Sequence, residues 1–197
     1  MKKTMLGLMM FIAAMPFMGF SQVEKPAGAG VDFLPGYIIT GNNEKIEGFI
    51  KESLKSQGGI AFVSNKGEKK QYNSFSLQSF FVNNTTYVSY SNDFYKVIVT
   101  GSKGALYQKA TDNSGKLINT DAEARVATTT DGKIGDYYLQ IKSTDSDDFA
   151  LITKKNFESV FTKVCADCVA LQNDIKAKQI DYAQVVKAVE VYNNCAK

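Results

Sequence analysis

Three cysteines carry the most distinctive chemistry in this sequence. Cys165 and Cys168 form a Cys-x-x-Cys pair, and Cys195 stands near the C-terminal end. Such a pair catalyses thiol–disulfide exchange when it opens a helix that follows a strand, usually within a βαβ unit. Here the flanking residues read as two helices in a mostly antiparallel fold, which favours a structural disulfide. A thiol–disulfide oxidoreductase using Cys165 and Cys168 is the lesser alternative.

Other catalytic chemistry is restricted because the chain contains no histidine. Ser-His-Asp and Cys-His catalysis are therefore excluded within this chain. Three cysteines also fall short of the four soft ligands that a structural zinc site needs. The sequence has no Walker loop, dinucleotide fingerprint or HExxH motif. We therefore expect no metal, no cofactor and no catalytic residue, and we expect that the chain is not an enzyme.

Carboxylates are the remaining means of catalysis. Glu44 and Glu47 fall on opposite faces of an expected strand, so they do not converge on a substrate. The acidic run TDSDD at 144–148 is more typical of a solvated turn than of a weak Ca²⁺ site. A carboxylate-dependent hydrolase acting on an envelope glycan is the main alternative, and a concave pair of carboxyl groups within about 5–10 Å would favour it.

The first 21 residues are typical of a secretory signal peptide. Lys2 and Lys3 form a basic start, an apolar run follows at 5–20, and Ser21 is a small residue before the expected cleavage point. The apolar run is shorter than the roughly 20 residues that span a membrane. The sequence thus predicts an exported protein, periplasmic, outer-membrane-associated or extracellular, without a stable membrane span after cleavage.

The composition agrees with cleavage. All six Met of the chain lie in this segment, and the 176 residues that follow it contain no Met, Trp or His. Loss of Lys2 and Lys3 lowers the formal net charge from +3 to +1. A chain so close to neutral has no electrostatic footprint for nucleic acid. Its length predicts one domain.

The pairing of the cysteines is left open by the residues alone. In an oxidising compartment cysteines pair by default. If the helices after Cys168 and before Cys195 are antiparallel, with a turn near 178–181, both Cys165 and Cys168 come within reach of Cys195 at a rise of ~1.5 Å per residue. Either bond would stabilise the fold by on the order of 3 kcal/mol.

The region 31–153 reads as a β-rich body after a flexible linker at 22–30. A hairpin with its loop at 41–43 would set Ile38 opposite Ile46, with alternating apolar and polar residues on either side. Further strands are expected at 60–64, 69–72, 76–82, 104–110, 136–142 and 148–153. The segment 111–135, rich in Thr, Asp, Gly and Ser, predicts a long mobile loop or a protruding hairpin.

The strongest hairpin signal lies at 85–101. A three-residue loop would pair Tyr90 with Phe94 and Val88 with Lys96. Both faces of this hairpin are apolar, so another element must cover the second face. Tyr87 and Tyr90 are the candidates for an aromatic binding surface, although core packing is the expected role of at least one of them.

Residues 154–197 predict a helical cap belonging to the same domain. Asp181 is a candidate N-cap for the last helix. The apolar stripe of that helix should pack on the sheet rather than bind a partner. Its members are Tyr182, Val185, Val186, Val189 and Tyr192.

Several of these stretches together resemble a family of uncharacterised secreted proteins from Bacteroidetes. They are PGYIITGNNEKIEGFIK, GALYQK, YYLQIK, NFESVF and DCVALQNDI followed by VVKAVEVYNNC. The resemblance implies a disulfide between Cys168 and Cys195, the two signature cysteines. Cys165 departs from the pattern, and Val169 stands where the pattern has Pro. The family has no assigned activity, so the resemblance implies only the cellular location and the fold of this chain.

The sequence therefore predicts an α+β fold, a largely antiparallel β-sheet or roll followed by a C-terminal helical cap. The expected function is that of an exported cell-envelope protein acting as a non-catalytic binding or structural module. Its partner would be an envelope protein or a glycan. Tyr87 and Tyr90 are the candidate contact residues.

Overall fold

A computed structural model describes residues 25–119, 124–142 and 149–195 of the chain. The predicted signal peptide and the acidic run at 144–148 lie outside the described residues. Ten strands form one sheet in the order β12-β11-β8-β7-β6-β5-β1-β2-β3-β4, and β9 pairs with β10 in a separate hairpin. The strands are β1 (Leu34–Thr40), β2 (Lys45–Ser53), β3 (Gly59–Ser64), β4 (Lys69–Asn73), β5 (Leu77–Val82), β6 (Thr85–Tyr90), β7 (Asp93–Thr100), β8 (Gly104–Lys109), β9 (Leu117–Asn119), β10 (Ala124–Val126), β11 (Tyr137–Ile141) and β12 (Ala150–Ile152).

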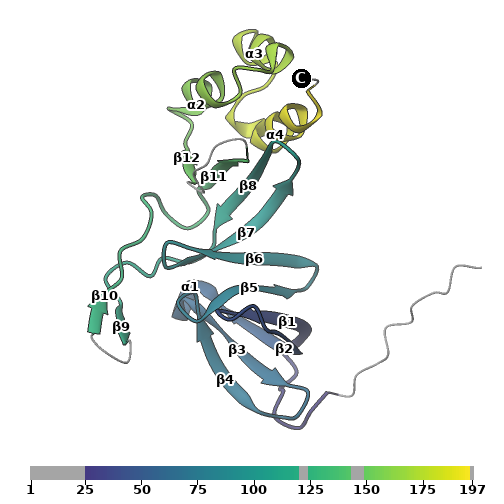
Figure 1. Ribbon diagram of the computed structural model, residues 1–197, viewed down its shortest axis with the longest axis vertical. Helices are drawn as coiled ribbons and strands as arrows, with labels where there is room; N and C mark the ends of the chain where they lie inside the picture. Colours follow the sequence, from purple (N-terminus) through teal and green to yellow (C-terminus); the bar gives the residue numbers. More distant parts are fainter. Residues whose placement is uncertain (1–24, 120–123, 143–148, 196–197) are drawn as a thin grey trace, which may run out of the picture.

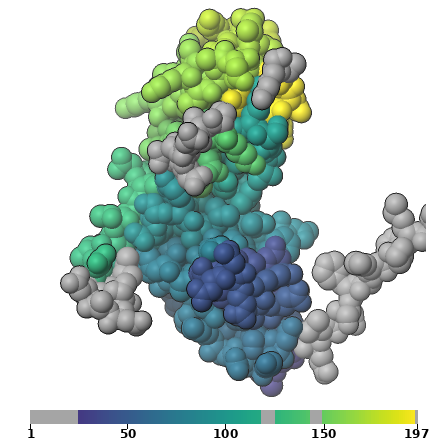
Figure 2. Space-filling view, viewed as in Figure 1, coloured from purple at the N-terminus to yellow at the C-terminus, as the bar shows by residue number. Residues whose placement is uncertain are grey.

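The described strand pairs are all antiparallel. With the C-terminal helices this makes an α+β protein that is mostly sheet, which confirms the predicted fold class. Figure 1 shows the sheet strongly twisted, with β1 to β4 at one end of the molecule and β8, β11 and β12 at the other. The space-filling view in Figure 2 shows the same elongated arrangement, with the cap in green and yellow at the top.

The first hairpin has the predicted register, because Ile38 lies opposite Ile46 in the β1–β2 pair. Alternate residues of β1, β2, β3, β5 and β6 point to one face of the curled sheet and fill its core. This core consists of Ile38, Ile50, Leu54, Ile60, Phe62, Leu77, Phe80, Val82, Tyr87 and Phe94. Leu54 belongs to α1 (Leu54–Gln57), the single turn of helix that connects β2 to β3.

The β6–β7 hairpin corrects the predicted register. Its turn has two residues, Ser91 and Asn92, both with positive φ (42° and 67°), so that Tyr90 pairs with Asp93 and not with Phe94. Two positive φ values are the requirement of a type I′ turn, whose backbone twist matches that of the two strands it joins. Asp93 is thereby drawn into β7, where its carboxylate is buried.

The C-terminal helices cover one face of the sheet at β7, β8 and β11 (Figure 1). They are α2 (Phe157–Val164), α3 (Val169–Lys176), a 3-10 turn (Tyr182–Gln184) and α4 (Val185–Asn194). Asp181 caps this last segment in a capping box with Gln184, as predicted. The predicted apolar stripe packs on the chain's own sheet, because its five members all contact the core beneath the cap.

Polar contacts fix the cap to the β7–β8 turn. The Asn193 side chain accepts hydrogen bonds from the backbone N–H groups of Lys103 (3.1 Å) and Gly104 (2.9 Å) and donates one to the Gly104 carbonyl. A Cβ on Gly101 would lie 2.0 Å from the Asn193 side chain, so this turn needs glycine to let α4 approach. Lys103 also forms an ion pair with Asp167 at 2.9 Å.

The opposite face of the same strands carries an aromatic cluster. Tyr95 and Tyr138 are fully buried there, and Phe149 stacks on Tyr90 (4.1 Å between ring centroids) and on Tyr107 (4.4 Å). Aromatic pairs at such distances add about 0.5–1.5 kcal/mol each beyond their burial. The second apolar face of the predicted hairpin is thus covered by rings of the chain itself.

The segment 111–135 contains the β9–β10 hairpin, which protrudes from the body in Figure 1. Its two roots are anchored, since Thr111, Asn113 and Ala127 are buried. Within the described residues, no helix is long and apolar enough to cross a membrane.

A polar cleft as the candidate functional site

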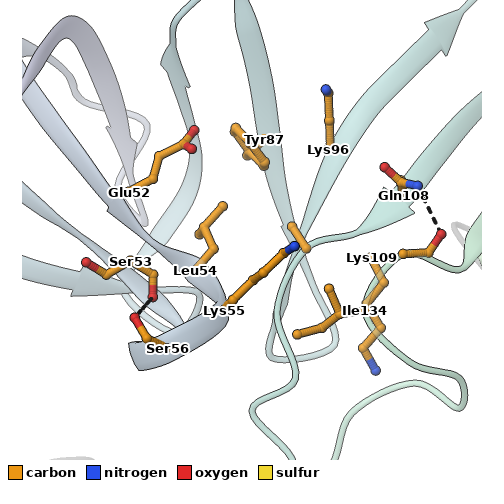
Figure 3. Close-up of a pocket in the computed structure, with 12 residues that line it drawn as sticks. Glu52, Ser53, Leu54, Lys55, Ser56, Tyr87, Lys96, Gln108, Lys109 and Ile134 are labelled. Atoms are coloured by element: carbon orange, nitrogen blue, oxygen red, sulfur yellow. Dashed lines mark hydrogen bonds between the residues drawn. The ribbon is translucent and has the colours of Figure 1, made fainter. Parts of the chain in front are cut away.

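A cleft of 540 Å³ opens between α1 and the strands β6, β7 and β8 (Figure 3). Its volume falls in the range of about 300–1,000 Å³ that small-ligand sites occupy. The lining residues come from β2, α1, β6, β7, β8 and the chain that leads into β11. They are Glu52, Ser53, Leu54, Lys55, Ser56, Tyr87, Lys96, Gln108, Lys109, Ala110, Ile134 and Gly135.

The inner part of the cleft is apolar. Leu54 is buried with 8% exposure, and Ala110 packs against the same core as a partly buried residue. Ile134, half-buried, faces them from the chain before β11. A ligand placed here would remove apolar surface from water, which contributes roughly 25 cal/mol per Å².

Glu52 and Tyr87 lie beside each other at one side of the cleft. Tyr87 is 8% exposed, and Figure 3 shows its ring beside the Glu52 side chain. Burial raises the pKa of Tyr87, and the neighbouring negative charge of Glu52 raises it further. The phenol therefore stays neutral near pH 7, and the exposed Glu52 carboxylate is available to a ligand.

Lys55 and Lys96 bring positive charge to the cleft. Lys55 is exposed on α1 and extends across the cleft in Figure 3, whereas Lys96 is half-buried on β7. In the described part of the chain, neither ammonium has a hydrogen bond, an ion pair or an aromatic ring as partner. Both groups are thus free to bind an anionic or hydrogen-bond-accepting group.

Gln108 and Lys109 form the wall at β8. The Gln108 side-chain amide donates to the Gly135 carbonyl at 3.0 Å, which leaves its oxygen on the side of the cleft (Figure 3). The Lys109 ammonium points away from the cleft in the same view. It donates to the carbonyls of Thr130 (2.9 Å) and Gly132 (3.3 Å), so Lys109 holds the wall in place and offers no charge to the cleft.

Behind this wall lies a buried ion pair. Lys109 Nζ is 3.1 Å from Asp93 Oδ2, and both side chains have no solvent exposure. Asp93 Oδ1 accepts hydrogen bonds from the Thr111 hydroxyl and the Asn113 backbone, each at 2.9 Å. Among the described residues, Oδ2 accepts no hydrogen bond, so its charge is balanced by the Lys109 ammonium. Buried charges persist only with such compensation.

Asn113 extends the polar network to α1. Its side-chain amide donates to the carbonyls of Asn92 (2.9 Å) and Gly58 (3.4 Å) and to the Ser74 hydroxyl (3.1 Å). Gly58 ends α1 at φ 71°, and a Cβ there would lie 2.0 Å from Asn113 Oδ1. The root of the 111–135 segment therefore joins α1, at one side of the cleft, to the β6–β7 turn.

The two predicted contact tyrosines are not brought together. Tyr87 lines the cleft, but Tyr90 is half-buried on the opposite face of β6, where it stacks on Phe149. Tyr87 itself stacks on Phe80 with ring centroids 4.6 Å apart, so most of its ring belongs to the core. A shared surface of Tyr87 and Tyr90 therefore has no basis in their geometry, and only Tyr87 reaches a concave site.

Cys168 is joined to Cys195, with their Cα atoms 5.8 Å apart. This is the pairing that the resemblance implies, and it ties the start of α3 to the end of α4. Cys165 is a free thiol with no solvent exposure. Burial raises the pKa of Cys165 to about 12, and the nearby Asp167 charge acts in the same direction. Such a thiol is a poor nucleophile near neutral pH.

The acidic chemistry of the cleft is limited. Glu52 is the one carboxylate among its lining residues. Over residues 25–119, 124–142 and 149–195, no three His, Cys, Asp or Glu side chains are grouped so as to hold a metal ion. Glu47, considered above as a candidate carboxylate, is exposed and forms an ion pair with Lys45 at 2.8 Å.

Comparisons with protein-family models, curated proteins and solved structures found no match to this chain. The assignment of the cleft therefore depends on its own geometry.

Sequence reasoning identified Tyr87 but missed the other cleft residues. Glu52, Lys55, Lys96 and Gln108 come from four separate elements and form no local motif. One signal was present, because Lys96 interrupts a strand whose neighbours are apolar. A charged residue at such a position needs either a buried partner or an opening to solvent.

Proposed function

We propose that this chain is a non-catalytic binding module of a bacterial cell envelope, and that its cleft receives a unit of an envelope glycan. The observation that carries the proposal is the pair of unpartnered ammonium groups, Lys55 and Lys96, beside an apolar inner surface. A concave, partly apolar site with a few convergent polar groups is the usual form of a ligand site. The volume of the cleft suits a ligand of one or two sugar rings, whereas a protein partner would need a broader surface.

Export is supported by three observations. The first 21 residues are typical of a signal peptide. The chain resembles a family of secreted proteins. A disulfide between Cys168 and Cys195 suits an oxidising compartment, since such bonds form and persist there.

Binding is favoured over hydrolysis because glycosidases ordinarily use two carboxyl groups about 5–10 Å apart. Glu52 has no second carboxylate beside it among the residues that line the cleft. Beside it lies the phenol of Tyr87, whose pKa is raised by burial, so the phenol is neutral. This arrangement can accept hydrogen bonds from sugar hydroxyls without supplying an acid and a base.

The proposal is tested with isolated peptidoglycan sacculi as the glycan probe. The exported, oxidised protein should cosediment with sacculi and release no soluble sugar fragments. A Lys55→Gln/Lys96→Gln double variant should cosediment less, whereas Lys66→Gln should behave as the wild type. Lys66 is a matched control, because it is an exposed lysine at the far end of β3 from α1. Soluble fragments would favour the hydrolase, and failure to cosediment would contradict the proposal.

A further inference from the structure

We infer that the glycan unit bound in the cleft carries a carboxylate, so that the ligand is an acidic saccharide. This inference rests on the proposed function and narrows its ligand. The charges of the cleft give the reason. Lys55 and Lys96 contribute two positive charges, Glu52 contributes one negative charge, and the charge of Lys109 is balanced by Asp93. The lining therefore has an excess of positive charge.

The position of Lys96 makes the cleft selective for a ligand with a negative charge. Lys96 is half-buried on β7 and has no partner among the described residues. A neutral ligand that covers it would remove water from an ammonium group and return only weak hydrogen bonds, which is unfavourable. A carboxylate would return charge-assisted hydrogen bonds, which are roughly twice as strong as neutral ones.

The other polar groups indicate that the anion belongs to a sugar. Glu52 and the Gln108 side-chain oxygen are hydrogen-bond acceptors beside the cleft. A simple carboxylate such as acetate has no donors for these acceptors. A saccharide acid supplies both an anion and hydrogen-bond donors, with its carboxylate toward the two lysines and its hydroxyls toward Glu52 and Gln108.

Two disaccharides form a matched pair of probes. N-acetylglucosaminyl-N-acetylmuramic acid carries a lactyl carboxylate, and N,N′-diacetylchitobiose is the corresponding neutral disaccharide. Titration calorimetry on the exported, oxidised protein should give at least about tenfold tighter binding of the acid, since one strong charge-assisted contact suffices for this factor. The preference should decrease at high salt, because the lysines are open to solvent.

The variants separate the inference from the proposed function. Lys55→Gln/Lys96→Gln should bind the two disaccharides about equally, and Lys66→Gln should keep the wild-type preference. Equal binding of both probes by the wild type would overturn the inference and leave the proposed function standing. A preference that persists in the double variant would also overturn it, because the carboxylate would then bind elsewhere. If neither probe binds, the proposed function fails and the inference fails with it.

Discussion

The ion pair of Asp93 and Lys109 shows how single residues support the cleft. Taking two charges out of water is costly, and only mutual compensation with further hydrogen bonds makes it tolerable. Lys109 meets Asp93 and two backbone carbonyls, and Asp93 meets Lys109, Thr111 and Asn113. The pair thereby joins β7 and β8 to the chain on either side of the protruding hairpin.

Removing one member of this pair should destabilise the protein strongly. Lys109→Met leaves the Asp93 carboxylate buried without its counter-charge, so the free energy of unfolding should fall by about 3–5 kcal/mol. Lys109→Met combined with Asp93→Asn should lose less than Lys109→Met alone, because no charge is then left unpaired. Urea unfolding of the three proteins measures these differences. A single variant as stable as the wild type would show that the pair is not buried as described.

The buried thiol and phenol groups also predict that the folded protein loses stability at alkaline pH. Burial raises the pKa of Cys165 and of Tyr192 to about 12, and it also raises the pKa of Tyr95. Above the ordinary values of about 8.5 for Cys and 10 for Tyr, the unfolded chain loses these protons while the folded chain keeps them. The free energy of unfolding should therefore decrease as pH rises from about 9 to about 12.

This pH dependence has a direct spectroscopic measurement. Phenolate absorbance should develop in the folded protein at higher pH than in the protein unfolded by urea. The Cys165 thiol should react with a disulfide reagent at pH 8 only after unfolding. Coincident phenolate titrations in the two states, or rapid modification of folded Cys165, would be incompatible with the buried positions of these groups.

At the scale of elements, the cap is held by a set of contacts that meet at one end of α4. Cys195 is bonded to Cys168, Asn193 binds the β7–β8 turn, and Tyr192 is buried in the core. These three residues make up the YN-x-C stretch near the end of the sequence. Their chemistry gives that pattern a structural reason, because each one attaches the last helix to a different part of the domain.

The disulfide should contribute measurable stability. It closes a loop with a sequence separation of 27 residues, for which the chain-entropy model gives roughly 3.5 kcal/mol. Cys168→Ala/Cys195→Ala should therefore lower the free energy of unfolding by about 3 kcal/mol. Cys165→Ala is the matched control, which removes a buried thiol but keeps the bridge, and it should cost less. A double variant that unfolds at the wild-type urea concentration would contradict this account of the cap.

The elements also show how far sequence reasoning reached. Ile38 opposite Ile46, the Asp181 cap and the stripe of the last helix were predictable, because local turn chemistry and periodicity determine them. The register of β6 and β7 was not predictable, because the same stretch of sequence is compatible with a two-residue turn and with a three-residue turn. The two-residue turn places Asp93 in β7, where it contacts Lys109, Thr111 and Asn113, and these contacts favour that register.

At the scale of the whole molecule, the cleft arises from how the sheet is curled. The β1–β5 end of the sheet brings α1 and Glu52 toward the strands β6 to β8 (Figures 1 and 3), and Ile134 and Gly135 complete the lining. Glu52 and Lys55 are close in sequence, but Lys96 and Gln108 come from strands far along the chain. No local pattern could have predicted their meeting, which depends on the twist of a ten-stranded sheet.

The most direct test of the central claim is to locate the ligand on the protein. Amide resonances of the exported, isotopically labelled chain would be followed during titration with N-acetylglucosaminyl-N-acetylmuramic acid. We predict that the largest shifts fall on residues 52–56 and on Tyr87, Lys96 and Gln108, while the cap around Cys195 stays unchanged. Large shifts confined to the cap or to the β9–β10 hairpin, with the cleft unaffected, would contradict the account.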